Sequence, residues 1–353
     1  MWSIRTISPT FAALTAALLF GASMPIAKEL VGQVSPILLA GLLYVGSGVG
    51  LIVIRLIKDR GWNHSDLVKK DWLWLTGAII FGGVLGPILL MAGLQQTGAA
   101  RASLLLNLET VLTAFLAWII FKEHTAFRIM LGMLLIVAGG ILLSWPSHGI
   151  TEQHNSLGPI AIAGACLCWA IDNNFTRNIS ASDPLFIAGG KGLTAGIVNT
   201  SLALLLGINL PNWQTIGYAL SVGFIGYGAS LVLFVLALRG LGTVRTGAYF
   251  STAPFIGAAT AILFFQDKPS LVFWAATLLM GIGVWLHLTE HHEHEHRHEP
   301  FSHSHRHTHD EHHLHTHHFD WDGKEPHAHA HHHEPLTHSH PHSPDIHHRH
   351  HHK

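Results

Sequence analysis

The sequence predicts an all-α integral membrane protein with ten transmembrane helices, arranged as two inverted five-helix repeats and followed by a disordered C-terminal tail. Three observations support this fold class. Apolar residues make up 49% of the 353 residues and charged residues only 12%, whereas about a quarter of the residues in a soluble protein are charged. One apolar stretch is present in two copies, and the composition changes abruptly near residue 290.

Ten apolar segments are long enough to cross a bilayer, which takes roughly 20 mostly apolar residues. The connectors between them are short, so we expect one helical bundle without an inserted soluble domain. The 35 glycines suit membrane helices, where small residues let backbones approach closely. Pro25, Pro87 and Pro254 fall inside segments and predict kinks. The ten segments cover residues 9–27, 36–54, 72–93, 102–121, 127–145, 157–176, 185–206, 213–238, 246–265 and 271–289.

An internal repeat relates the two halves of the apolar region. Residues 98–123 align with residues 242–267 without a gap, at an offset of 144. Fixed-period self-similarity of this kind indicates a repeated structural unit. The aligned pairs include Gly98 and Gly242, Arg101 and Arg245, Phe121 and Phe265, and the acidic residues Glu123 and Asp267.

The first segment could be a signal peptide, but it has a counterpart in the second half. At an offset of 149 the matching pairs are Ala12 and Ala161, Ala16 and Ala165, Phe20 and Trp169, and Lys28 and Arg177. This recurrence favours a first transmembrane helix over a cleaved leader. The predicted domains are therefore a first repeat (9–145), a second repeat (157–289) and a tail (290–353).

The distribution of Lys and Arg predicts the orientation. With the N-terminus in the cytoplasm, the inner connectors hold eleven basic residues and the outer connectors three, Lys28, Arg101 and Lys268, as the positive-inside rule requires. Both termini then lie in the cytoplasm of a multi-pass protein in the inner cell membrane. Because five is an odd number, the second repeat enters from the opposite side. Transporters with inverted repeats bind substrate near the midplane, between the halves.

Short motifs on this layout resemble those of EamA-type transporters in the drug/metabolite transporter superfamily. The motifs are FGASMPIAK at 20–28, its counterpart WAIDNNFTR at 169–177, and the helix ends FKE at 121–123 and FQD at 265–267. The resemblance covers residues 9–289. It implies two EamA domains, secondary transport without ATP, often export, and a central cavity, but no particular substrate. The second acidic motif, with Gln266 before Asp267, matches the family pattern less well than the first. The long tail is not part of the common family pattern.

Five polar residues inside apolar segments are candidates for the transport pathway. A charge at the centre of a membrane helix costs at least ~2.5 kcal/mol, so such a residue is a functional candidate by default. Glu109 lies in the fourth segment with Asn107 two residues before it. Asp172 lies in the sixth segment, followed by Asn173, and Lys191 lies in the seventh.

Alternatives remain open for each charged candidate. Asp172 and Lys191 lie four and six residues from the inner ends of their segments, hence at similar depth. The first alternative is an ion pair between the two helices. The second is that Asp172 binds a cation or proton at the cytoplasmic mouth of the transport pathway, and the third is that the Lys191 side chain extends to the membrane–water interface. Glu109 has no evident partner on an adjacent segment, and its repeat counterpart is Ala253. The resemblance implies that Glu109 faces the cavity and carries a proton or binds a cation; helix–helix hydrogen bonding is the alternative.

The tail is rich in histidine. Between residues 291 and 353, 27 of 63 residues are His, mixed with acidic residues, Pro, Ser and Thr. No apolar periodicity is present, so the tail is predicted to be disordered. Neutral imidazole binds Zn, Cu and Ni, and a pH-responsive polycation is the alternative because His protonates near pH 6.5. The candidate metal ligands are His291, His292, His294, His296, His298, His303, His305, His307 and His309.

These features lead to three functional hypotheses. The first is efflux of a divalent transition metal (Ni, Co or Zn) captured by the tail. The second is export of a metabolite, amino acid or drug, with a tail that only buffers or senses metal. The third is a membrane-tethered metal store. The sequence contains no nucleotide loop, nucleophile elbow or catalytic dyad, so we expect neither an enzyme nor a required cofactor. The expected partners are the lipid bilayer and a small solute or metal ion, not nucleic acid, and a homodimer is left open.

Overall fold

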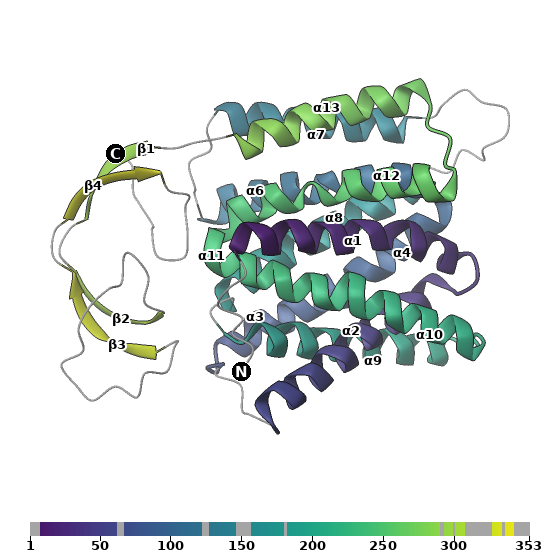
Figure 1. Ribbon diagram of the computed structural model, residues 1–353, viewed down its shortest axis with the longest axis horizontal. Helices are drawn as coiled ribbons and strands as arrows, with labels where there is room; N and C mark the ends of the chain where they lie inside the picture. Colours follow the sequence, from purple (N-terminus) through teal and green to yellow (C-terminus); the bar gives the residue numbers. More distant parts are fainter. Residues whose placement is uncertain are drawn as a thin grey trace. The chain divides into compact units, whose positions relative to one another are not determined.

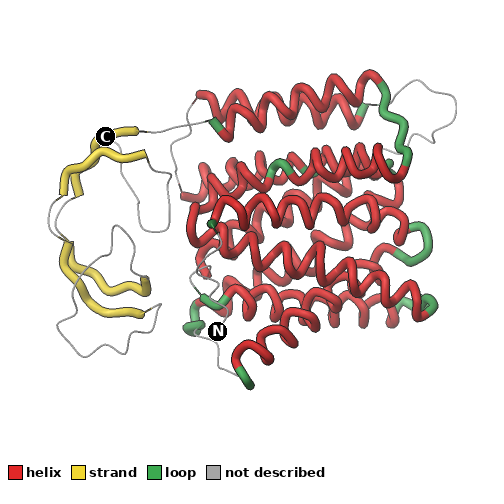
Figure 2. Tube along the Cα trace, in the orientation of Figure 1, coloured by secondary structure: helices red, strands yellow, loops and turns green. Residues whose placement is uncertain are grey.

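The computed structural model describes residues 8–61, 67–121, 127–145, 157–179 and 182–289, together with four strands between 293 and 341. The chain divides into a helical unit and a tail unit, His291–Ser343. In the helical unit the helices lie side by side in one bundle (Figures 1 and 2).

The first half of the bundle ends at α7 and the second begins at α8. The first half contains α1 (Pro9–Val31), α2 (Pro36–Asp59), α3 (Asp71–Ala78), the π-helical turn η2 (Ile79–Leu85), α4 (Gly86–Gln96), α5 (Ala99–Leu105), α6 (Asn107–Phe121) and α7 (Phe127–Ser144). The second half contains α8 (Leu157–Ile179), α9 (Pro184–Leu205), α10 (Trp213–Val222), the π-helical turn η3 (Gly223–Ala229), α11 (Ser230–Phe250), α12 (Ala253–Phe265) and α13 (Leu271–Leu288).

The ends of the helices have local causes. Ser8 precedes α1 and Ser35 precedes α2, and each hydroxyl accepts a hydrogen bond from a backbone amide of the first turn. Proline follows each serine at the first helical position, where a missing N–H costs nothing. At the end of α2, Arg60 adopts a left-handed conformation with φ of 54°, which closes the helix before Gly61.

All ten predicted segments form helices. α11 (Ser230–Phe250) includes the end of the eighth segment and the start of the ninth, but it is not straight: the Phe234 and Phe250 rings lie 4.9 Å apart, whereas 16 residues of straight helix span about 24 Å. The chain therefore reverses direction near the predicted connector, and the two apolar spans are Trp213–Leu241 and Arg245–Phe265. A further break falls at Ser251 and Thr252, just before α12. Pro254 explains this position, because proline has no backbone donor and its ring excludes the carbonyl four residues earlier, which belongs to Phe250.

The two halves are structural repeats. The offset of 144 residues carries η2 onto η3 residue for residue. The fourth predicted segment breaks at Leu106 and the ninth at Ser251, which are nearly equivalent positions. Packing is exchanged between the halves: α1 lies against α11 and α12, while α8 lies against α4 and α6. This reciprocal packing is what a two-fold relation between inverted repeats produces, and the predicted all-α membrane fold is confirmed.

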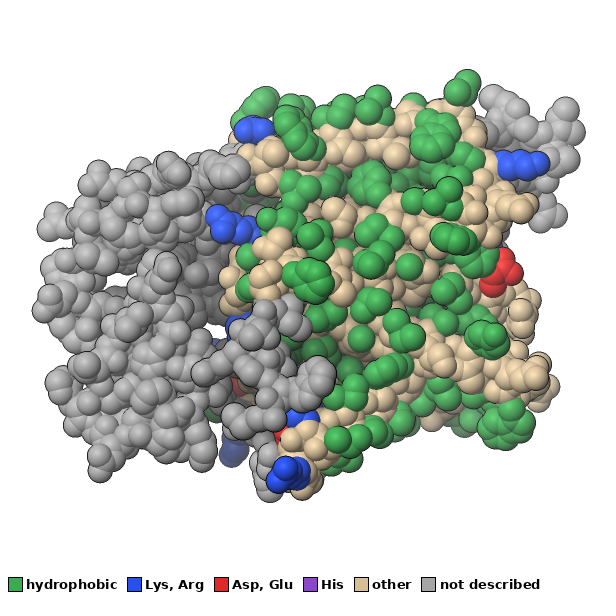
Figure 3. Space-filling model, in the orientation of Figure 1, with side chains coloured by type: hydrophobic (Ala, Val, Ile, Leu, Met, Phe, Trp, Pro, Cys, Tyr) green, Lys and Arg blue, Asp and Glu red, His purple; other side chains and the backbone are tan. Residues whose placement is uncertain are grey.

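The surface of the bundle suits a lipid environment. In the described part of the chain, eight helical stretches are long and apolar enough to cross a membrane by length and composition. α8 and α9 have 23 and 22 residues but carry the polar candidates Asp172 and Lys191. Hydrophobic side chains spread along the helices in Figure 3, and basic side chains lie toward the helix ends. Large apolar side chains such as Phe127 and Leu271 are 78% and 88% exposed.

Close backbone contact makes Gly223 intolerant of a side chain. A Cβ at Gly223 would overlap the backbone carbonyl of Leu43, whereas a Cβ at Gly217 has no atom within 4 Å. We expect Gly223→Ala to lower the free energy of unfolding by about 1–3 kcal/mol through overpacking, and Gly217→Ala to leave it unchanged or slightly higher. Thermal unfolding of the purified variants in one detergent measures the difference; equal stabilities would contradict the packing of α2 on η3.

The tail differs from its predicted disorder in four strands, which are drawn in yellow in Figure 2. β1 (Glu293–His298) pairs antiparallel with β4 (Leu336–Pro341), and β2 (Phe301–His307) pairs antiparallel with β3 (His327–His333). Alternation explains the difference, because His recurs at every second position and a period of two is the strand period. Within the described part of the tail, each sheet has two strands.

Candidate functional site

A cavity lies where the two repeats meet. It encloses about 500 Å³, counting the space at its open side. The first repeat contributes α1, α2 and α6, and the second contributes α8, α9, η3 and α11. The lining residues are Phe20, Tyr44, Glu109, Trp169, Asp172, Asn173, Lys191, Gly226, Tyr227, Ser230, Leu231, Phe234 and Phe250. Four of the five predicted pathway residues are therefore brought together in one place.

Glu109 lies just after the break in the fourth predicted segment. It is in the first turn of α6, where the partial positive charge of the helix N-terminus favours a carboxylate. The side chain is half-buried, and its Oε1 accepts a hydrogen bond of 2.8 Å from Nδ2 of Asn173 on α8. The sequence alone shows no partner for Glu109, and the structure supplies one. The Asn173 amide is also 3.5 Å from the Thr113 hydroxyl.

Asp172 and Lys191 form a buried ion pair. Lys191 Nζ donates to Asp172 Oδ2, and the two residues are 4% and 3% exposed. The Thr176 hydroxyl donates to the second carboxylate oxygen, at 3.0 Å. This pairing was one of the three alternatives for these residues, and it occurs within the cavity wall. The adjacent Gly82 must lack a side chain, because a Cβ there would overlap the Asp172 carboxylate.

The π-helical turn η2 positions two aromatic side chains on the cavity wall. The Gly82 carbonyl accepts hydrogen bonds from the Tyr44 hydroxyl at 2.8 Å and from Trp169 Nε1 at 3.0 Å. The next carbonyl, of Gly83, accepts from Nδ2 of Asn199 at 3.2 Å. Pro87 cannot donate to that carbonyl, which lies four residues before it. The predicted kink thus frees backbone acceptors, and side chains from three other helices use them.

Aromatic rings form much of the remaining wall. The Phe20 ring lies 5.9 Å from Trp169, 5.6 Å from Tyr227 and 5.5 Å from Phe250, between centroids. Phe234 continues this wall, 4.9 Å from Phe250. Phe20 and Trp169 are the repeat counterparts found in the sequence, and here they touch. The other rings were not predicted as site residues, because aromatic residues inside apolar segments are too common to single out.

Asn107 does not line the cavity. It is fully buried at the start of α6, and its Nδ2 donates to the Leu104 carbonyl at 3.0 Å and lies 3.8 Å from the Met280 sulfur. Residues two apart on a helix point to different faces, so Asn107 and Glu109 are directed differently. Asn107 therefore stabilises the helix break rather than contributing to the cavity surface.

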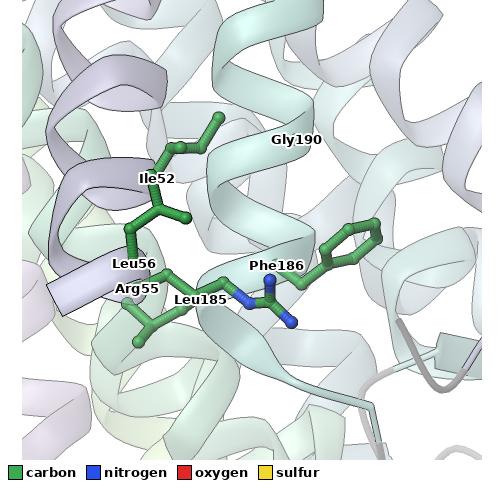
Figure 4. A pocket seen from close by; sticks show the side chains of 6 residues that line it. All are labelled: Ile52, Arg55, Leu56, Leu185, Phe186 and Gly190. Atoms are coloured by element: carbon green, nitrogen blue, oxygen red, sulfur yellow. The ribbon is translucent and has the colours of Figure 1, made fainter. Parts of the chain in front are cut away.

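A second, smaller crevice lies between α2 and α9 (Figure 4). Its lining is apolar except for Arg55, whose guanidinium lies 5.2 Å from the centre of the Phe186 ring. Arg55 Nε also donates to Asp183 Oδ2 at 2.8 Å. The arginine is thus engaged in joining two helix ends, and the crevice offers a ligand little polar surface.

Lys28 and Asp267 hold the opposite end of the bundle together. Lys28 Nζ donates to the carbonyl of Leu94, at 2.6 Å, at the C-terminus of α4. Asp267 Oδ2 accepts from the backbone amide of Ala100, at 2.9 Å, at the N-terminus of α5. A cation at a helix C-terminus and a carboxylate at an N-terminus are both favourable. The short connector between α4 and α5 is therefore fixed by α1 and by the segment after α12.

Metal-binding geometry is not found in the described residues. No group of three His, Cys, Asp or Glu side chains there could hold a metal ion. Of the predicted tail ligands, His291, His292 and His309 lie outside the described residues. The others are on strands: His294, His296 and His298 on β1, and His303, His305 and His307 on β2.

The chain is similar to a family of transporters over most of its length. The model of the EamA-like transporter family matches residues 7–145 and 156–289. An uncharacterized transporter of Methanothermobacter thermautotrophicus is 28% identical over 288 residues, covering 77% of this chain and 84% of that protein. The uncharacterized transporter YyaM of Bacillus subtilis is 25% identical over 280 residues, covering 74% and 88%.

A shorter relative and a solved structure add to this comparison. ArnE of Pseudomonas aeruginosa, a probable 4-amino-4-deoxy-L-arabinose-phosphoundecaprenol flippase subunit, is 33% identical over 107 residues, covering 30% of this chain and 89% of that protein. A crystal structure with 18% identity has a TM-score of 0.61 and covers 79% of this chain and 96% of that one. At this level of identity, the likeness supports the fold alone.

Proposed function

This chain belongs to the EamA-like transporter family, and from that membership we propose that it moves a small organic solute through the cavity around Glu109 by alternating access. One observation carries the proposal: both repeats line the same cavity, which contains a half-buried carboxylate. Inverted-repeat transporters bind substrate at such an interface, and rocking of one half against the other alternates access. Secondary transport needs no nucleotide site, since an ion gradient drives it.

The depth of the lining residues favours a cavity that opens toward the cytoplasm. Asp172 lies seven residues before the end of α8, and Lys191 lies seven residues after the start of α9, which is about 10 Å at the α-helical rise. The distribution of basic residues assigns both of these ends to the cytoplasmic side. Lys28 and Asp267 close the other end. We therefore assign the structure to an inward-facing state, with both termini in the cytoplasm of an inner membrane.

Export from the cell is tested by solute accumulation. Cells that lack the protein, cells that overproduce it and cells that overproduce its Glu109→Gln variant are compared for intracellular metabolites and for growth on toxic metabolite analogues. Export predicts lower intracellular levels of at least one organic solute in the overproducing cells, and normal levels in the variant. The absence of any Glu109-dependent change in an organic solute would contradict the proposal.

Weakening the contacts at the end of the bundle that contains Lys28 and Asp267 should make the cavity more accessible from outside the cell. Asp267→Asn removes the charge that caps α5, so we expect a larger population of the outward-facing state. The readout is a cysteine introduced by Leu231→Cys, with Cys166 and Cys168 replaced by alanine, and labelled with a membrane-impermeant maleimide. Labelling from the outside should rise several-fold in the Asp267→Asn variant, because a lost cap costs about 1 kcal/mol. Unchanged labelling would contradict the role given to Asp267.

Divalent-metal efflux is the second candidate, and the register of the tail strands favours it. Within the two sheets, five pairs of histidines are opposite each other in the backbone register: His294 and His340, His296 and His338, His303 and His331, His305 and His329, and His307 and His327. Directly opposite residues of an antiparallel pair are close neighbours, so this backbone register places histidine positions together in pairs. A tail of this kind would gather Ni, Co or Zn for a transporter.

Deleting residues 291–353 separates metal efflux from metal buffering. Metal efflux predicts that loss of the whole protein sensitises cells to Ni, Co or Zn and raises their metal content, and that loss of the tail has part of this effect. A tail that only buffers or stores metal predicts lower cell-bound metal after the deletion, with organic solute transport unchanged. Metal content measured by mass spectrometry decides between them.

A further inference from the structure

We infer that the cavity selects organic cations that carry an aromatic or other apolar body. The inference rests on the proposed function, because it names the substrate class of the same cavity. Three properties of the wall support it: its net charge, its aromatic surface and one buried hydroxyl group.

The wall has one carboxyl group that no cationic side chain of the described lining neutralises. Among the described residues that line the cavity, three are charged: Glu109, Asp172 and Lys191. Asp172 and Lys191 neutralise each other in a buried ion pair. Glu109 accepts its hydrogen bond from Asn173, which is neutral. A cationic group on a substrate would supply the opposite charge at Glu109, where partial burial weakens screening by water.

The aromatic wall suits the rest of such a molecule. Phe20, Trp169, Tyr227 and Phe250 lie in a continuous set of ring contacts between 5.5 and 5.9 Å. Aromatic faces attract cations, with Trp the strongest, by about 0.5–2 kcal/mol depending on desolvation. The same rings offer apolar surface to a hydrocarbon or aromatic body. Both parts of an organic cation therefore find complementary surface in one cavity.

Tyr227 supplies a separate indication that a ligand belongs here. Its side chain lines the cavity and is 6% exposed, and its hydroxyl has no hydrogen-bond partner among the described residues. A buried polar group without a partner costs about 1–3 kcal/mol. A substrate with a polar group within reach of Tyr227 would remove that cost.

Other substrate classes fit the wall less well. A divalent metal ion needs several carboxylate, imidazole or thiolate ligands, but of the two carboxylates here Asp172 is already bound by Lys191 and Thr176. An anion would meet the charge of Glu109. A zwitterion needs a cationic partner for its carboxylate, and Lys191 is committed to Asp172.

Four probes that share one aromatic ring test the assignment. Phenethylamine is a cation, phenylalanine a zwitterion, 3-phenylpropionate an anion and 2-phenylethanol neutral. Their binding to the purified full-length protein in lipid nanodiscs is measured by calorimetry at neutral pH. We expect phenethylamine to bind at least about tenfold more tightly than the other three, the scale of one well-formed ionic or cation–π contact.

Substitutions locate the site. Glu109→Gln should weaken phenethylamine binding at least about tenfold and leave 2-phenylethanol binding unchanged, since only the charge is removed. Phe20→Leu should weaken the binding of both phenethylamine and 2-phenylethanol. Glu29→Gln removes an exposed carboxylate at the end of α1 and should change neither. This control distinguishes the effect of the charge at Glu109 from the effect of changing the net charge of the protein.

Several outcomes would overturn the inference. They are a preference for phenylalanine or 3-phenylpropionate, no binding of phenethylamine to the folded protein, or displacement of phenethylamine by Zn²⁺ in a Glu109-dependent manner. Glu109-dependent movement of some other solute in proteoliposomes would then leave the transport proposal standing. Conversely, Glu109-dependent phenethylamine binding with no movement of any solute would refute transport and retain the binding class.

Discussion

Replacing Glu109 with glutamine is expected to abolish transport while the protein still folds and reaches the membrane. The carbonyl of the new side chain can still accept the hydrogen bond from Asn173, so the contact between α6 and α8 persists. What is lost is the uncompensated negative charge of the cavity and the capacity to exchange a proton. We expect the initial rate of solute movement into proteoliposomes to fall to that of protein-free vesicles.

Two further variants sharpen this experiment. Glu109→Asp keeps the charge but shortens the side chain, so it should retain a measurable part of the rate. Glu29→Gln should retain all of it. Thermal unfolding and membrane content, measured on the same preparations, establish that a loss of rate is not a loss of protein. Transport at the unmodified rate by Glu109→Gln would remove this carboxylate from the mechanism.

Replacing Lys191 with methionine is expected to produce the largest loss of stability. Methionine fills a similar volume, but Asp172 would remain as a buried carboxylate without its cation. Breaking a buried ion pair from one side costs about 3–5 kcal/mol. The measurement is the free energy of unfolding, or the shift in Tm, of the purified protein in a fixed detergent.

A double-mutant cycle identifies the cause of this loss. Adding Asp172→Asn to Lys191→Met removes the unpaired charge, so most of the lost stability should return. Lys58→Met replaces an exposed lysine on α2 and should be nearly neutral. If the double variant were as unstable as the sum of the two single variants, the pair would not be coupled as the structure indicates.

The helical architecture could be predicted from the sequence because its signals are long and repeated. Twenty-residue apolar segments mark the helices, and an offset of 144 marks the repeat. The reversal of the chain near residues 239–245 could also be predicted, because basic residues and glycine interrupt the apolar sequence there. The break at Ser251 and Thr252 was not predicted, although Pro254 favours it by excluding the carbonyl four residues earlier.

The sequence predicted the charged residues of the cavity and Asn173, but not its aromatic wall. Glu109, Asp172 and Lys191 are conspicuous because charges inside apolar segments are costly, and similar depth suggested the pairing of the last two. The role of Asn173 as partner of Glu109 depends on how α8 packs on α6, which local sequence does not encode. Asn107 was included because it is near Glu109 in sequence, although the helix directs the two side chains differently.

The matched positions of η2 and η3 bear on the origin of the chain. A π-helical turn closes with i→i+5 bonds and is rare in proteins, so two independent gains at equivalent sites would be a coincidence. A single gain in a half-length ancestor, copied when the gene doubled and fused, accounts for both. Such an ancestor could have enclosed a passage only by joining with a second, oppositely inserted polypeptide, which implies that pairing between separate molecules preceded the present one-chain architecture.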